Sequence, residues 1–121
     1  MRVLVSVEPR MYREALALSL HQHRPGLEVR IAPPEFAEEE LRSFRPHVLV
    51  RSDTDGLGPE ALAEVPFRVE VIYSDSMDAK VILDGQEEEV KDASTEDLLR
   101  VADEARRWLS TEDRPHKDRG P

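Results

Sequence analysis

The chain of 121 residues contains no cysteine. This absence excludes disulfide bonds, thiolate catalysis and cysteine-ligated zinc. No apolar run approaches the roughly 20 residues that a membrane-spanning helix requires, and residues 1–5 lack the pattern of a signal peptide. We therefore expect a cytoplasmic domain with no membrane partner.

Basic residues are scarce relative to acidic ones. The chain has 17 Lys and Arg against 26 Asp and Glu, which gives a net charge of −9. A field of this sign repels phosphate backbones, so we expect no nucleic-acid partner. A protein partner with a basic surface is electrostatically favoured, and the sequence leaves open whether the chain forms a homodimer.

The chain also lacks two common catalytic motifs. Gly56-Leu57-Gly58 has neither the third glycine nor the long following helix of a phosphate-binding loop. Ser52 does not lie in a Gly-x-Ser-x-Gly elbow, and His47 shares its strand, so a hydrolase triad is excluded. We expect a protein that is not an enzyme.

Strand-like apolar runs alternate with helical periodicity along the chain. In the first helix Met11, Ala15 and Leu18 mark the expected apolar face, with Leu16 and Leu20 beside it. Alternation of this kind predicts an α/β fold with a mainly parallel sheet and helices on both faces. Strands are predicted at 3–7, 27–31, 47–52 and 67–73, and helices at 11–23, 35–44, 60–64 and 94–109.

The region after the fourth strand departs from this alternation. Two strand-like runs, 79–83 and 86–91, flank Asp84-Gly85, which is a strong signal for a β-hairpin with a type I′ turn. Ser94 is the expected N-cap of the last helix, whose predicted apolar stripe is Leu98, Val101, Ala102, Ala105, Trp108 and Leu109. We predict one domain over 1–110 and a disordered tail over 111–121, because the tail has no apolar periodicity.

The ordered set of motifs resembles the receiver domain of two-component response regulators, and most closely the type fused to helix-turn-helix effectors. The resemblance implies a flavodoxin-like three-layer sandwich with a sheet of about five strands in the order 2-1-3-4-5, here with a β-hairpin in place of the usual fourth helix. The segments that carry it are 3–16, Arg45-Pro46-His47-Val48-Leu49-Val50, Val71-Ile72-Tyr73-Ser74 and Val90-Lys91-Asp92-Ala93-Ser94.

The resemblance also implies a phosphorylation site at the carboxyl ends of the strands. In receivers, two acidic residues after the first strand and a phosphate-accepting Asp bind Mg²⁺, while a Ser or Thr and a Lys contact the phosphoryl group. The acidic pair falls here on Val7 and Glu8, and the acceptor falls on Ser52. The degenerate phospho-site implied by the match comprises Glu8, Ser52, Asp53, Ser74 and Lys91.

The substituted residues cannot perform this chemistry. Acyl phosphate formation needs a carboxylate nucleophile beside a cation held by oxygen ligands, and Val7 offers no oxygen. Asp53 lies one residue late, so it replaces the acceptor only if the strand ends with a bulge. Carboxylates that could converge at the strand ends to hold a cation, or that simply belong to turns, are Glu8, Asp53, Asp55, Asp75 and Asp78. Of these, Glu8 and Asp53 are weak metal candidates, and we expect neither Mg²⁺ nor another cofactor.

We therefore predict a non-catalytic pseudo-receiver that acts through protein contacts in bacterial signalling or transcriptional control. Two alternatives stay open: a Mg²⁺-dependent phosphoryl acceptor that uses Asp53, and a module that binds a small molecule at the strand ends. Lys91 either pairs with Asp53 or Glu8 or is solvated. Glu87-Glu88-Glu89 forms an acidic ridge on the hairpin, which either protects a sheet edge or docks a basic partner.

Overall fold

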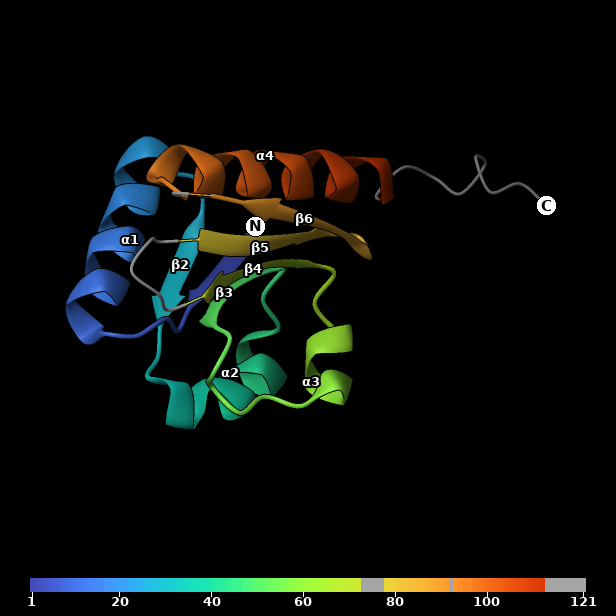
Figure 1. Ribbon diagram of the computed structural model, residues 1–121. Coiled ribbons are helices and arrows are strands. Elements are labelled where there is room, and N and C mark those ends of the chain that lie inside the picture. Colours follow the sequence, from blue (N-terminus) through green and yellow to red (C-terminus); the bar gives the residue numbers. More distant parts are fainter. Residues whose placement is uncertain (73–77, 92, 113–121) are drawn as a thin grey trace.

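A six-stranded mixed sheet forms the centre of the computed structural model, with α-helices on both of its faces (Figure 1). The structure describes residues 1–72, 78–91 and 93–112. The strands are β1 (Arg2–Val5), β2 (Glu28–Ile31), β3 (Val48–Ser52), β4 (Phe67–Ile72), β5 (Asp78–Leu83) and β6 (Gln86–Val90). The helices are α1 (Arg10–His23), η1 (Pro34–Phe36), α2 (Ala37–Phe44), α3 (Pro59–Ala63) and α4 (Thr95–Glu112).

The strand order is β2-β1-β3-β4-β5-β6. The first four strands pair in parallel, whereas β5 pairs antiparallel with β4 and β6 pairs antiparallel with β5. The prediction of an α/β fold with helices on both faces is confirmed. The predicted mainly parallel sheet of about five strands, in the order 2-1-3-4-5, is wrong in this half of the sheet. Both hairpin strands join it, and the antiparallel β5 takes the place beside β4.

The hairpin itself forms as predicted, with Asp84 and Gly85 at φ values of 51° and 90°. Positive φ at both central positions is the signature of a type I′ turn, whose twist matches that of the flanking strands. This turn lets β6 return directly along β5. Only five residues separate β4 from β5 in the sequence, fewer than the dozen or so that a parallel crossover needs, and β5 pairs antiparallel with β4.

Two apolar clusters hold the layers together. The larger lies between the sheet and helices α1 and α4, and includes Val5, Val50, Leu20 and Val101. The smaller lies on the other face, and its sheet residues, Leu4 and Leu49, come from β1 and β3. The face of β4, β5 and β6 opposite α4 contributes no residue to either cluster in the described part of the chain.

Helix α1 buries only one side of the predicted apolar face. Leu16 and Leu20 are buried together with Arg13, whereas Met11 and Leu18 are 82% and 57% exposed. The buried positions are three and four residues apart, as one helix face requires. The buried face is therefore centred on Leu16 and Leu20, not on Met11 and Leu18 as predicted.

The last helix carries its predicted apolar stripe, with Leu98, Val101, Ala102 and Ala105 buried. Ser94 stands at its start, where the Asp97 carboxylate accepts hydrogen bonds from the Ser94 backbone N–H at 2.8 Å and its hydroxyl at 3.2 Å. Asp97 thus makes the bond to the N-cap N–H that a capping box has, whereas its own N–H donates to the Ser94 carbonyl at 3.1 Å. The helix continues to Glu112, two residues into the predicted tail, and residues 113–121 lie outside the described part of the chain. Over the described ranges, no helix is both long and apolar enough to span a membrane.

Candidate functional site

Ser52 ends the central strand β3, at the position that the resemblance gives to a phosphate acceptor. The residue is 4% exposed, and its hydroxyl oxygen accepts a hydrogen bond from the Glu8 backbone N–H at 2.9 Å. The hydroxyl therefore joins the end of β3 to the loop that follows β1. Among the described residues the hydroxyl has no hydrogen bond to a base, so nothing there activates this serine as a nucleophile.

The acidic residue in the loop after β1, Glu8, faces a positively charged side chain of this protein, Arg13. Val7 is fully buried, while the Glu8 side chain is 59% exposed. The buried guanidinium of Arg13 lies 3.7 Å from the Glu8 carboxylate, measured from Nη1 to Oε2, and Nη1 also donates to the Val7 carbonyl at 3.4 Å. A fixed cation thus sits beside the one acidic residue of the expected metal-binding pair.

Asp53 does not take the acceptor's place. The β3–β4 register runs without interruption to Ser52 opposite Val71, so the described strand has no bulge that would turn Asp53 inward. Its backbone N–H donates to the Val71 carbonyl at 3.1 Å, and the residue is exposed. Asp53 therefore lies in the exposed turn after Ser52, outside the strand-end position of the acceptor.

Lys91 follows β6, at the same edge of the sheet as Ser52 but far across it. The register aligns Ser52 with Val71, Ala79 and Val90 on successive strands. Three strand spacings amount to about 14 Å, which is longer than a lysine side chain. Lys91 is exposed, and no ion pair joins it to Glu8 or Asp53. The insertion of β5 between β4 and β6 accounts for this separation.

Two predicted residues, Ser74 and Asp75, lie outside the described ranges. Within those ranges no group of three His, Asp or Glu side chains is placed to hold a metal ion. The carboxylates that the sequence suggested for a cation site do not converge there. Asp55 in particular belongs to another set of contacts.

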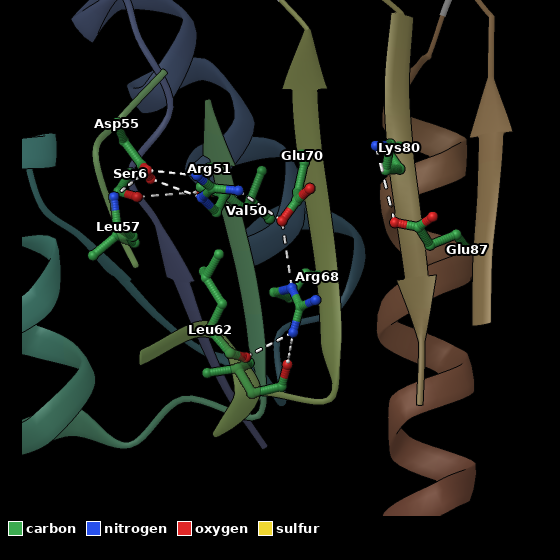
Figure 2. A network of polar contacts seen from close by, with 11 residues as sticks. Ser6, Val50, Arg51, Asp55, Leu57, Leu62, Arg68, Glu70, Lys80 and Glu87 are labelled. Carbon is green, nitrogen blue, oxygen red and sulfur yellow. Dashed lines mark hydrogen bonds and ion pairs between the residues drawn. The ribbon is translucent and has the colours of Figure 1, made fainter. Parts of the chain in front are cut away.

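A network of buried charged side chains lies on the face of β3 opposite to the Ser52 side chain (Figure 2). The sequence patterns did not predict it. Arg51 is 6% exposed at its side chain and Asp55 is fully buried. The Arg51 guanidinium donates to both Asp55 oxygens, at 2.9 Å from Nε and 2.6 Å from Nη2, and to Glu70 at 2.6 Å from Nη1. Asp55 also accepts the Leu57 backbone N–H at 3.0 Å, which fixes the turn after β3.

The network has a clear electrostatic consequence for Arg51. Burial opposes its charge, but the hydrogen bonds and negative charges of Asp55 and Glu70 outweigh burial and raise the pKa of Arg51. The guanidinium therefore stays charged. A bidentate pair of this kind positions a loop more than it stabilises the fold, because desolvation offsets much of the attraction.

Arg68 extends the network along β4. Its Nη1 donates to the carbonyls of Leu62 and Val65 at 2.6 and 2.9 Å, which ties the end of α3 to the sheet. Its Nε lies 3.4 Å from the Glu70 carboxylate and is a buried donor without a hydrogen-bond acceptor.

The same register continues the charges across the face of the sheet opposite α4. Arg51 pairs with Glu70, Glu70 with Lys80 and Lys80 with Glu89, so positive and negative side chains alternate over four strands. Lys80 also lies 3.9 Å from Glu87 (Figure 2). Cross-strand pairs of opposite charge stabilise a register. The signal in the sequence was the charge of Arg51, Arg68 and Glu70 within the predicted strands 47–52 and 67–73.

The chain matches no protein-family model, no curated protein and no solved structure.

Proposed function

We propose that this protein is a non-catalytic pseudo-receiver with a flavodoxin-like arrangement, acting through protein contacts in bacterial signalling or transcriptional control without being phosphorylated. The proposal starts from the ordered resemblance of residues 2–109 to receiver domains. The contacts of Ser52 support it most directly, since its buried hydroxyl already accepts the Glu8 N–H.

The surroundings of Ser52 support the same reading. Val7 gives no oxygen ligand, Arg13 supplies a fixed positive charge beside Glu8, and Lys91 stands three strands away. Phosphoryl transfer to a carboxylate requires a nucleophile, a cation and charge-stabilising donors in one place. Asp53 alone, exposed in a turn, meets only the first of these requirements, so we do not favour the phosphoryl-accepting alternative.

The surface for protein contacts is, in this proposal, the hairpin edge, which we define as Asp84 and Glu87–Glu89. β6 is the last strand of the sheet, so its outer side has no described strand partner. Glu87 and Glu88 contact Lys80 and Arg100 at 3.9 and 3.4 Å. Two copies pairing edge to edge would bring acidic residues together, which favours a basic partner over a homodimer at this edge.

Exposure to acetyl phosphate and Mg²⁺, followed by intact-mass measurement, tests the absence of phosphorylation. We expect no phosphoryl adduct on the native chain. An adduct that maps to Asp53 and disappears in Asp53→Asn would overturn the proposal.

A labelled oligo-arginine peptide tests the partner surface. We expect Glu87→Gln with Glu89→Gln to weaken its binding more than Glu38→Gln with Glu39→Gln, a pair of exposed acidic residues on α2 that makes the same change in net charge. Equal losses in the two double variants would show that only the net charge matters and would contradict a specific acidic edge.

A further inference from the structure

A groove of about 660 Å³ opens at the edge of the sheet opposite Ser52. It lies where β3 and β4 begin, between the C-terminal parts of α2 and α4. Its volume falls within the range of sites for small molecules. Its described lining consists of Leu41, Arg42, Arg45, Pro46, His47, Glu64, Val65, Pro66, Phe67, Trp108 and Leu109.

One wall of the groove is aromatic and held in place. Phe67 is 3% exposed, and the Trp108 ring meets it edge to face with centroids 5.4 Å apart at 69°. The Trp108 Nε1–H donates to the Asp84 carboxylate at 3.2 Å, and the Asp84 N–H donates to the Pro66 carbonyl at 2.8 Å. The hairpin turn thus fixes the indole ring. A flat ligand that packs against this ring does not have to order it, which lowers the entropic cost of binding.

The other wall is basic, in a chain whose net charge is −9. Arg42, Arg45 and His47 line it, against a single lining carboxylate, Glu64, among the described residues. Arg42 has a partner in Glu38 at 3.2 Å. The Arg45 guanidinium makes no ion pair with any described side chain, and α2 ends with Arg45 in the left-handed conformation, at φ 50°.

The N-terminal strand fixes the backbone of this basic wall. The Arg2 side chain donates from Nε to the Arg45 carbonyl at 2.9 Å, and the Arg2 backbone N–H donates to His47 Nδ1 at 2.9 Å. The guanidinium of Arg45 is a donor suited to a carboxylate.

We propose that this groove binds a small aromatic carboxylate, with its ring against Phe67 and Trp108 and its carboxylate at Arg45. A single negative charge fits better than a phosphate group. The nearby end of α2 is a C-terminus with partial negative charge, whereas phosphate sites use helix N-termini. This proposal goes beyond the protein contacts proposed for the hairpin edge, which has Asp84 in common with the groove because the Asp84 carboxylate accepts the Trp108 N–H.

Binding is tested on the full chain by calorimetry with 2-naphthoate and with its neutral counterpart 2-naphthamide. The indole N–H resonance of Trp108, the only tryptophan in the chain, reports whether the ligand enters the groove. We expect saturable binding of 2-naphthoate that shifts this resonance, and about tenfold weaker binding of the amide, as loss of one charge-assisted hydrogen bond predicts.

Arg45→Gln is expected to weaken 2-naphthoate about tenfold and to leave 2-naphthamide nearly unchanged. Arg10→Gln is the matched control, because Arg10 is 79% exposed on α1 and lies outside the groove. The proposal fails if neither ligand binds at millimolar concentration, if acid and amide bind equally, or if both variants lose affinity alike. Binding that appears only after residues 113–121 are deleted would also overturn it for the full chain.

Discussion

Replacing Asp55 by Asn removes the negative charge that faces buried Arg51. The amide keeps one oxygen, which can still accept either the Leu57 N–H or one guanidinium N–H, and turns an NH₂ group toward a cation. Breaking a buried pair costs about 3–5 kcal/mol when a charge is left without a partner. Glu70 still binds Arg51 at 2.6 Å, so we expect a smaller loss, about 2–3 kcal/mol.

The free energy of unfolding is measured by urea denaturation, with circular dichroism as the probe and the m-value required to stay constant. Asp53→Asn is the matched control, because it makes the same chemical change two residues away at an exposed position. We expect the control to change stability by less than about 0.5 kcal/mol. Equal effects of the two substitutions, or a stabilised Asp55→Asn chain, would refute the reasoning that burial sets the cost.

Three further predictions concern other parts of the fold. Ser52→Ala is expected to cost about 1–2 kcal/mol in urea denaturation, because it leaves the Glu8 N–H without its acceptor, and no loss would contradict the contact. Gly85→Ala is expected to cost about 1–2 kcal/mol by the same measurement, because φ is 90° there, whereas an unchanged midpoint would argue against the type I′ turn. The hydrogen bond from Arg24 lowers the pKa of Asp103 below 3.8, so the pair stabilises the fold above that pH and its contribution is lost as pH falls through the lower folded-state value. Asp103→Asn should therefore lower the urea midpoint at neutral pH and leave it unchanged at about pH 2, and equal losses at both would contradict the linkage.

Local patterns in the sequence were sufficient for the hairpin and for the last helix. Asp84-Gly85 between alternating runs indicates a type I′ turn because few other dipeptides accept positive φ twice. The stripe of α4 has regular helical spacing. Whether the hairpin joined the main sheet could not be read in this way, since β4–β5 pairing depends on contacts that no local pattern encodes.

The burial of charged residues is a second feature that the sequence patterns did not predict. Arg51 lay in the predicted strand 47–52, but its partners Asp55 and Glu70 lie 4 and 19 residues away. A search for apolar periodicity does not predict that such a residue is buried. In α1, Met11 was placed on the apolar face but is exposed, whereas the charged residue Arg13 is buried.

The sequence predicted where the candidate site lies, at the ends of the strands, but it did not predict which side chains meet there. The resemblance located Ser52 and Glu8, which the structure brings within hydrogen-bonding distance. It also placed Lys91 beside them, and there the added strand β5 intervenes. A residue aligned by motif keeps its role only if the strands between it and the site are the same.

The most direct test of the closed strand-end site is a magnesium titration of the native chain, followed by thermal unfolding and by the amide resonances of Glu8 and Asp53. Binding to the folded state alone must raise the unfolding temperature. We predict no rise and no saturable shift of either resonance up to millimolar Mg²⁺. A saturable stabilisation together with shifts at Glu8 and Asp53 would contradict the account and restore the phosphoryl-accepting alternative.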